Sequence, residues 1–230
     1  MSDFFRFPHT PHIAWLGIDS PRDDKVLDSD QAQALLAGEV VVEEKIDGAN
    51  LGLAVTANGE IRAQNRGQYL TEPCAGQFSR MGAWLSQHRY ALLDHLSPKL
   101  ILFGEWCAAR HSLDYNELPD WYMVFDVWDR VAKRFWSTPR RDALATRLGL
   151  ALVPCIYRGK ARMSDLQSLL EKSMSRYRCG PPEGIVVRSE DAQWTLARAK
   201  LVRSEFTQTI GQHWRSRAIE WNRVKPPIRL

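Results

Sequence analysis

Hydrophobic residues in this chain recur at every second position in several short segments, which is the pattern of half-buried β-strands. Three consecutive valines in residues 40–44 predict a buried strand, and the alternation in residues 51–56 predicts a second one. Residues 61–64 are expected to return as its partner, because Asn58 and Gly59 between them accept the positive φ angles of a tight turn. This part of the chain therefore predicts a strand followed by a β-hairpin.

Three other segments carry the spacing or the end signals of helices. Residues 77–96 predict an amphipathic helix, whose apolar positions are Phe78, Met81, Leu85, Leu92 and Leu96. Thr138 and Pro139 predict the start of another helix and Gly149 its end, because proline suits the first turn and glycine the position after the last. A capping box at residues 164–167 predicts the start of one more helix.

The remaining apolar and β-branched runs predict further strands, at residues 100–106, 121–129, 150–157, 184–188 and 194–202. Strands thus outnumber helices, and several neighbouring strands are close enough in sequence to form hairpins. The pattern predicts an α+β protein built on mainly antiparallel sheets flanked by helices.

Composition narrows the class of protein. The 230 residues fit one large domain with a short appendage, and we predict a domain over residues 1–205 and a basic extension over residues 206–230, packed on it or next to it. Hydrophobic residues make up 44% and charged residues 25%, which excludes a wholly disordered chain. No apolar run approaches the ~18–20 residues that span a bilayer. Residues 1–8 lack the pattern of a secretory signal, so we expect a cytoplasmic protein without membrane association.

The four cysteines include no Cys-x-x-Cys pair. Neither a zinc site nor a disulfide framework is therefore expected. The pattern indicates reduced thiols in a reducing compartment.

Positive charge gathers at the end of the chain. From Arg198 onward there are eight basic and two acidic residues, whereas the preceding 197 residues hold 23 basic and 25 acidic ones. A basic tail suggests an anionic partner, although a solvated surface explains the same charges. The tail also interleaves aromatic and basic residues, which suits either a nucleic-acid strand or a helix packed on the main domain: Trp214, Arg215, Arg217, Trp221, Arg223 and Lys225.

The strongest local motif is Glu-Glu-Lys-Ile-Asp-Gly-Ala-Asn at residues 43–50. Lys45 closes a predicted buried strand, and Asp47 and Gly48 make a sharp turn after it. A lysine held among other cations can lose its proton, and its neutral amine can then attack an electrophile such as the α-phosphorus of a nucleotide. Taken alone, the motif is equally an ordinary strand end followed by an Asp-Gly turn.

Five more segments follow in order, namely Asn65–Gly67, Phe103–Glu105, Val124–Asp126, Pro182–Val187 and Arg198–Lys200. This ordered series resembles the covalent nucleotidyltransferase superfamily of polynucleotide ligases and mRNA capping enzymes. Within it, the motif around Lys45 is most similar to the RNA ligase 2 branch of the ATP-dependent RNA ligases. The resemblance covers roughly residues 40–203 and implies a ligase-type adenylyltransferase fold.

The resemblance also implies roles for single residues in nucleotide binding. Lys45 would be the nucleophile that forms a lysyl-AMP phosphoamidate and releases pyrophosphate. Glu44 would lie near the adenine, and Glu105 would contact the ribose hydroxyls. Phe125 would stack on the adenine, with Asp126 beside it.

Further roles concern the phosphates. Asn50 and Arg66 would hold the 5′-phosphate of the strand being joined, and Glu183 would organise Mg²⁺ or Mn²⁺ at the α-phosphate. Lys200 would neutralise that phosphate, helped by Arg198, which stands where the family usually has lysine. Residues two apart on a strand face the same side, so Arg198 and Lys200 are expected to point the same way.

Each of these residues also has an ordinary structural explanation when taken singly. Arg66 suits an exposed hairpin and Phe125 a core. Asn50 can simply end a turn, and Glu105, Glu183 and Arg198 can be surface residues. The ordered occurrence of the segments favours the functional explanation.

The implied activity is ATP-dependent joining of RNA 5′-phosphate and 3′-hydroxyl ends. A nicked duplex is one form in which the RNA ends can be presented. The protein is assumed to be a monomer. About 30 residues follow Lys200, so no OB-fold domain is expected. Three alternatives stay open: sealing of DNA, capping-type transfer, and a nucleotide-binding module that adenylylates without sealing.

Overall fold

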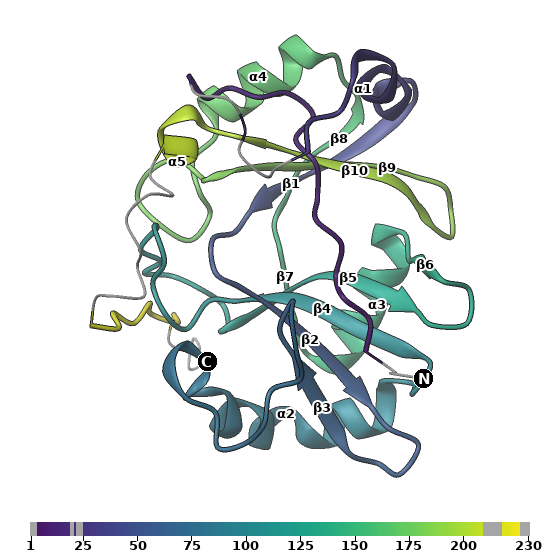
Figure 1. Cartoon of the computed structure of the whole chain (residues 1–230), viewed down its shortest axis with the longest axis vertical. Helices are drawn as coiled ribbons and strands as arrows, with labels where there is room; N and C mark the ends of the chain where they lie inside the picture. The colour runs from purple at the N-terminus through teal and green to yellow at the C-terminus, as the bar shows by residue number, and fades with distance from the viewer. Residues whose placement is uncertain (1–3, 19–20, 22–24, 209–217, 226–230) are drawn as a thin grey trace, which may run out of the picture. The chain divides into compact units, whose positions relative to one another are not determined.

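The computed structural model describes residues 4–18, 21, 25–208 and 218–225. The chain forms two compact units, each with its own sheet (Figure 1). Unit 1 holds residues 1–7, 48–152 and 219–230, and unit 2 holds residues 8–47 and 153–218. The predicted α+β class is confirmed, and no OB-fold domain occurs in the described part of the chain. The predicted division at residues 205 and 206 stays a prediction.

Unit 1 contains a mostly antiparallel sheet of six strands. Its main order is β3-β2-β4-β5-β6, and β7 pairs with β5 in parallel. The strands are β2 (Ala49–Val55), β3 (Ile61–Gln64), β4 (Leu100–Trp106), β5 (Tyr122–Asp129), β6 (Arg134–Phe135) and β7 (Ala151–Leu152). The predicted hairpin joins β2 and β3, and Gly59 in its turn has a φ of 75°.

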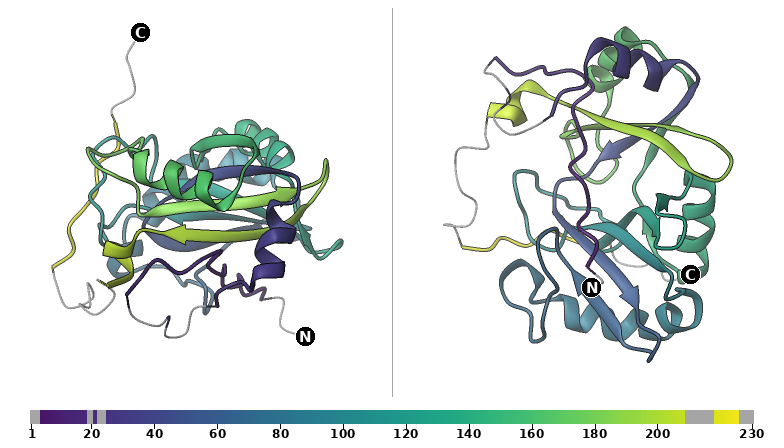
Figure 2. Two further views of the ribbon diagram at one scale, coloured as in Figure 1. Left: turned by 90° about the horizontal axis from the view of Figure 1, so that it is seen from above. Right: turned by 45° about the vertical axis from the view of Figure 1, so that its right-hand side comes forward.

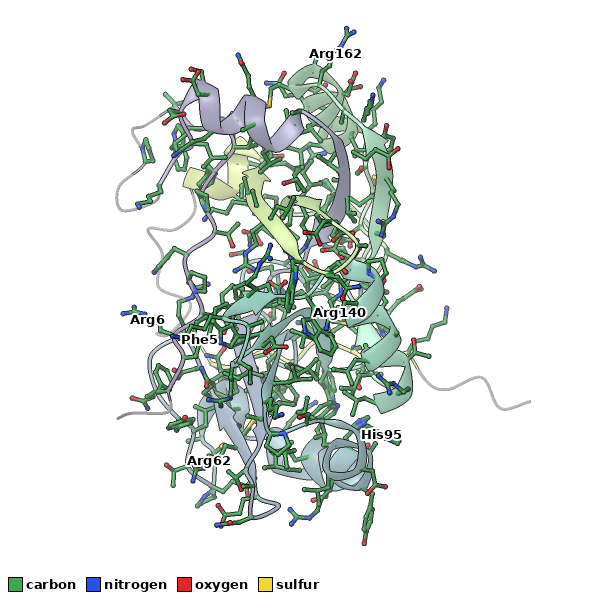
Figure 3. The ribbon with its side chains drawn as sticks, turned by 90° about the vertical axis from the view of Figure 1, so that its right-hand side faces the viewer. Phe5, Arg6, Arg62, His95, Arg140 and Arg162 are labelled. Carbon is green, nitrogen blue, oxygen red and sulfur yellow. The ribbon has the colours of Figure 1, made fainter. Side chains whose placement is uncertain are left out.

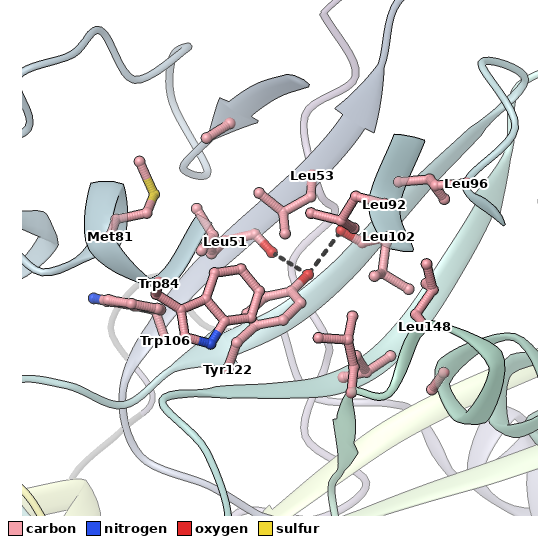
Figure 4. Close-up of a cluster of buried hydrophobic side chains, with 14 of the residues drawn as sticks. Leu51, Leu53, Met81, Trp84, Leu92, Leu96, Leu102, Trp106, Tyr122 and Leu148 are labelled. Carbon is pink, nitrogen blue, oxygen red and sulfur yellow. Dashed lines mark hydrogen bonds between the residues drawn. The ribbon is translucent and has the colours of Figure 1, made fainter. Parts of the chain in front are cut away.

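Two helices, α2 (Met81–His95) and α3 (Thr138–Leu148), cover one face of this sheet. Tyr122 lies at the centre of the core between them, with its hydroxyl 3.2 Å from the carbonyl oxygen of Leu51 and 2.9 Å from that of Leu102 (Figure 4). A buried hydroxyl without a partner would cost roughly 1–3 kcal/mol, so these contacts let a phenol occupy an apolar core.

The other face of the unit 1 sheet is covered by aromatic residues from the start of the chain. Phe5, which is labelled in Figure 3, stacks on Trp128 with ring centroids 4.0 Å apart. Phe7 meets Phe103 at 4.8 Å and Phe125 at 5.3 Å. The sequence pattern did not predict this packing, because Phe5 and Phe7 lie outside any strand or helix.

Unit 2 contains a four-stranded antiparallel sheet in the order β10-β9-β1-β8. The strands are β1 (Glu39–Lys45), β8 (Cys155–Lys160), β9 (Gly184–Glu190) and β10 (Thr195–Val202). Two helices, α1 (Ser29–Leu36) and α4 (Met163–Lys172), pack on one face of the sheet (Figures 1 and 2). A short helix, α5 (Ser204–Gln208), follows β10.

The edge of this sheet at β10 is lined by residues 11–13. Lys200 donates its backbone N–H to the carbonyl of Pro11 at 2.8 Å, and Ile13 donates to the carbonyl of Lys200 at 2.9 Å. His12 therefore forms a parallel bridge with Lys200. These bonds hold both the N–H and the carbonyl of Lys200 at this edge of the sheet.

The structure corrects two predicted boundaries. The helix predicted over residues 77–96 begins at Met81, after a short 3₁₀ turn over Gly76–Phe78. The strand predicted over residues 150–157 is two strands, β7 in unit 1 and β8 in unit 2. Pro154 lies between them, and proline has no N–H to donate to a strand ladder.

Helix starts also differ from the prediction. The N-cap of α3 is Ser137 rather than Thr138, while Gly149 ends the helix in the left-handed conformation as predicted. Helix α4 begins at Met163, where Asp165 accepts the backbone N–H of Arg162 at 2.8 Å. Helix α1 was not predicted, although Asp28 caps it by accepting the N–H of Gln31 at 2.8 Å.

The described part of the C-terminal tail belongs to unit 1. Asn222 is buried there, accepting the N–H of Tyr115 at 2.9 Å and donating to the carbonyl of Cys107 at 2.8 Å. Trp221 packs under the guanidinium of Arg80 at 4.0 Å. The predicted contacts of Trp214, Arg215 and Arg217 fall outside the described residues. None of the described helices is both long and apolar enough to cross a lipid bilayer.

Candidate active site

Apolar residues lie on one face of the unit 2 sheet and charged residues lie on the other. Val40 and Val42 of β1 belong to the core under α1 and α4, so Val41, Glu43 and Lys45 point to the opposite face. The register places Val186 between Glu43 and Lys200, which brings Lys200 to the face of Lys45. Strand β1 and the hairpin of β9 and β10, which lie far apart in the sequence, thus contribute to one charged surface.

Lys45 ends β1 opposite Gly184, the first residue of β9. A Cβ at Gly184 would lie 2.5 Å from the carbonyl oxygen of Leu201, so only glycine fits this close approach of β9 and β10. The preceding residue, Glu183, accepts a hydrogen bond from Lys45 Nζ at 2.5 Å. The side chain of Lys45 is 26% exposed and that of Glu183 is 16% exposed, so the pair is sheltered but open to a ligand.

The Glu183 carboxyl responds to several neighbours in unit 2. Burial raises its pKa, the ammonium of Lys45 opposes that shift, and the charge of Asp47 adds to it. Lys200 also lowers the pKa, which places its charge within electrostatic range of Glu183. The structure therefore groups Lys45 with Glu183 and Lys200, from which the sequence separates it by more than a hundred residues.

Arg198 lies on the same face as Lys200, as the spacing of two residues predicts. It is paired across the sheet with Arg188 of β9. Arg188 is 3% exposed and donates from Nε to Glu43 at 2.7 Å, and the Glu43 side chain is only 1% exposed. The sequence carries no signal for this buried ion pair, because nothing in it shows that residues 43 and 188 lie on adjacent strands.

Glu44 is held differently from Lys45. It is 4% exposed, and its Oε2 accepts the backbone N–H of Arg176 at 3.0 Å. Burial raises its pKa against the opposing effects of Ser175, Arg176 and Arg178. Its Oε1 is buried without a hydrogen-bond partner among the described residues, so this oxygen is available to a donor from a ligand.

In unit 1 three predicted residues share one face of the sheet. Asn50 of β2 pairs directly with Glu105 of β4, so their side chains lie on the same side. Phe125 of β5 packs with Phe7 and Phe103 on that side. The face opposite to α2 and α3 thus carries Asn50, Glu105 and Phe125.

Phe125 occupies a β-bulge. Phe103 pairs with Asp126 and Gly104 pairs with Val124, so the register between β4 and β5 passes over Phe125. A bulge changes the alternation of side chains, which lets Phe125 and Asp126 both be directed toward the face of Glu105. Simple alternation along a strand predicts opposite faces for two consecutive residues.

Arg66 lies in the turn after β3. It is exposed, and the turn is closed by Asn65, whose side-chain oxygen accepts the N–H of Gly67 at 2.8 Å and of Gln68 at 2.9 Å. Arg66 therefore has a stable backbone frame and a side chain available to solvent. Asn50, in the same unit, has a buried side-chain oxygen without a partner in the described part of the chain.

The described residues include no group of three or more His, Cys, Asp or Glu side chains that could hold a metal ion. Glu183 and Asp47, however, are close enough in unit 2 for the charge of Asp47 to raise the pKa of Glu183. Mg²⁺ is usually held by one or two carboxylates together with phosphate oxygens and water. The residues present fit a divalent cation bound in that way.

Comparison with known proteins places this arrangement in a family. The family described as RNA ligase has a model that matches residues 38–202. No curated protein sequence gives a significant match. Two forms of an archaeal ATP-dependent RNA ligase resemble the chain. Form 1 has a TM-score of 0.61 and 23% sequence identity, over 88% of this chain and 49% of the archaeal chain. Form 2 has a TM-score of 0.60 and 21% sequence identity, over 87% of this chain and 49% of the archaeal chain.

A variant of the Naegleria gruberi RNA ligase solved with ATP and Mn gives a TM-score of 0.64 and 15% identity, over 90% of this chain and 59% of that chain. At these identities the structural likeness establishes the fold. The chain spans about half the length of the archaeal ligases.

Proposed function

Because the chain belongs to the RNA ligase family, we propose that it is an ATP-dependent RNA ligase that joins 5′-phosphate and 3′-hydroxyl ends through AMP bound covalently to Lys45. The observation that carries the proposal is the grouping of Lys45, Glu183 and Lys200 on one face of the unit 2 sheet. An amine, a carboxylate and a second cation are the groups that nucleotidyl transfer to a lysine requires.

In the first step the neutral amine of Lys45 attacks the α-phosphorus of ATP. A P–N bond forms, the bond from the α-phosphorus to the bridging oxygen breaks, and pyrophosphate leaves. Lys45 must first lose a proton, and the Glu183 carboxylate at 2.5 Å is placed to accept it. Lys200 and Arg198 stabilise the negative charge that grows on the α-phosphate.

In the second step an oxygen of the RNA 5′-phosphate attacks the phosphorus of lysyl-AMP, the P–N bond breaks, and Lys45 regains its proton. In the third step the 3′-hydroxyl attacks the activated 5′-phosphate, loses its proton, and releases AMP. Asn50 and the exposed Arg66 bind the 5′-phosphate, since an amide and a guanidinium both donate hydrogen bonds to phosphate oxygens. RNA ends, in single strands or in a nicked duplex, are the partner of this reaction.

The nucleoside is bound by the remaining residues. Glu44 Oε1 accepts a hydrogen bond from the adenine amino group, which gives this buried oxygen the partner that it otherwise lacks. Glu105 accepts from the ribose hydroxyls, and Phe125 stacks on the base. Glu183, whose carboxylate has a second oxygen besides the one that Lys45 contacts, would hold Mg²⁺ or Mn²⁺ together with the nearby Asp47, and the ion would polarise the phosphate oxygens.

Adenylylation should depend on pH through Glu183. Only the carboxylate can accept the proton of Lys45, and burial raises the pKa of Glu183. As the pH falls, the carboxylate is therefore lost at a higher pH than in an ordinary glutamate, and the rate of AMP transfer falls with it. We expect the acidic limb of the single-turnover pH profile to reflect two ionisations in the wild type, those of Glu183 and Lys45, and the ionisation of Lys45 alone in the slow Glu183→Gln variant. The same limb in both proteins would contradict this role.

The proposed activity is tested by sealing of 5′-³²P-labelled strands with ATP and Mg²⁺. We expect joining of RNA ends in a nicked duplex or in single strands, with lower rates on matched DNA. Joining of DNA in preference to RNA would overturn the assignment to RNA, and GMP transfer in preference to AMP would indicate a capping-type enzyme.

The same assay distinguishes a second candidate function, that of an adenylylating module that does not seal by itself. Stable lysyl-AMP without joining of any substrate would support that function over the first.

A further inference from the structure

The bulge at Phe125 leaves a gap in the hydrogen bonding of the unit 1 sheet. On one side of β5, pairing with β4 skips Phe125. On the other side, pairing with β7 includes Val124, and pairing with β6 resumes at Trp128. The backbone carbonyl of Phe125 therefore needs a donor from outside the strand ladders, since a buried unpaired carbonyl is costly.

Arg141 of α3 supplies that donor. Its Nη1 donates to the carbonyl oxygen of Phe125 at 2.8 Å, across 16 residues of sequence. The guanidinium is fixed from its other side by Asp142, with Oδ1 at 2.8 Å from Nε and 2.7 Å from Nη2. The Arg141 side chain is only 3% exposed, so its guanidinium has little contact with water.

Burying an arginine to donate to a carbonyl costs free energy that packing alone does not explain. Desolvation of a charge costs several kcal/mol, and an apolar residue of similar size would fill the space without that cost. Charged donors, however, hold their acceptors more tightly than neutral ones do. The arrangement thus holds the backbone of Phe125 in place at the cost of burying a charge in the core.

We propose that Arg141 is a positioning residue for nucleotide binding, which fixes the bulge so that the ring of Phe125 is presented to the base of ATP. The inference rests on the proposed function, in which Phe125 stacks on adenine. Arg141 acts through the Phe125 carbonyl and touches neither the nucleotide nor the reacting atoms. Loss of the bond lets the bulge relax, so ATP binding weakens while the transfer of AMP from bound ATP proceeds as before.

The test measures single-turnover formation of protein–AMP at increasing ATP concentrations in the full chain. We expect Arg141→Met to raise the ATP concentration at half-maximal rate by about tenfold, with little change in the maximal rate. Arg141→Lys keeps one charged donor and should recover part of that loss. Arg140→Met is the matched control, because Arg140 precedes Arg141 on the same helix and stacks on the Trp136 ring at 4.1 Å (Figure 3 labels Arg140).

A double-mutant cycle with Phe125→Ala separates positioning from general stability. If Arg141 acts through Phe125, adding Arg141→Met to Phe125→Ala should change the half-maximal ATP concentration little further. Fully additive effects, or equal effects of Arg140→Met and Arg141→Met, would overturn the inference. Absence of protein–AMP in the wild type would instead reject the proposed function, and a Phe125→Ala variant with normal ATP dependence would reject the stacking role.

Discussion

Replacing Lys45 with arginine is expected to abolish the transfer of AMP to the protein, with a loss of at least about a thousandfold in rate. Arginine keeps the positive charge and can still donate a hydrogen bond to Glu183, which Lys45 contacts at 2.5 Å. It cannot act as a nucleophile, because the guanidinium stays protonated and offers no amine lone pair. The substitution therefore removes the chemistry and preserves the ion pair.

The measurement is incorporation of label from α-³²P-ATP into the protein, followed by denaturing electrophoresis. Lys172→Arg is the matched control, because Lys172 is an exposed residue in the last turn of α4. It should label like the wild type. Label in Lys45→Arg at the wild-type level would show that another residue carries the nucleotide.

Much of the fold could be predicted because its signals are local. Continuous apolar and β-branched runs predicted the strands later seen as β1 and β4, alternation predicted β2, and the turn at Gly59 predicted the hairpin. The same signals failed at Pro154, where one apolar run crosses from one sheet to another. The packing of Phe5 and Phe7 was also invisible, since aromatic residues in an extended segment carry no period.

The candidate site was predictable only as a set of separate segments. The motifs named Lys45, Glu183 and Lys200, but their grouping depends on the pairing of β1, β9 and β10. Residues that act on other residues left no signal at all. Nothing in the sequence marks Arg141 of α3, and only its 2.8 Å bond to the Phe125 carbonyl indicates such a use.

The ion pair of Glu43 and Arg188 yields the largest expected effect on stability. Glu43→Gln should lower the free energy of unfolding by about 3–5 kcal/mol, because it leaves the Arg188 cation buried without its counter-charge. Arg188 is 3% exposed, so it has little access to water in compensation. The change is measured as a shift of the urea midpoint of unfolding. The control is Glu220→Gln in the exposed ion pair of Arg110 and Glu220. Because the Glu220 side chain is 66% exposed, this substitution should shift the midpoint little.

A double variant separates the charge from the space that it fills. Glu43→Met with Arg188→Met removes both charges and keeps most of the volume, so it should recover most of the stability that Glu43→Gln loses. If the double variant is as unstable as the single one, packing rather than charge holds these strands together. If the double variant is stable but transfers AMP slowly, the charges of Glu43 and Arg188 contribute to AMP transfer as well as to stability. Glu43 and Arg188 share that face with Lys45 and Lys200, so an uncharged pair changes the field in which the phosphates bind.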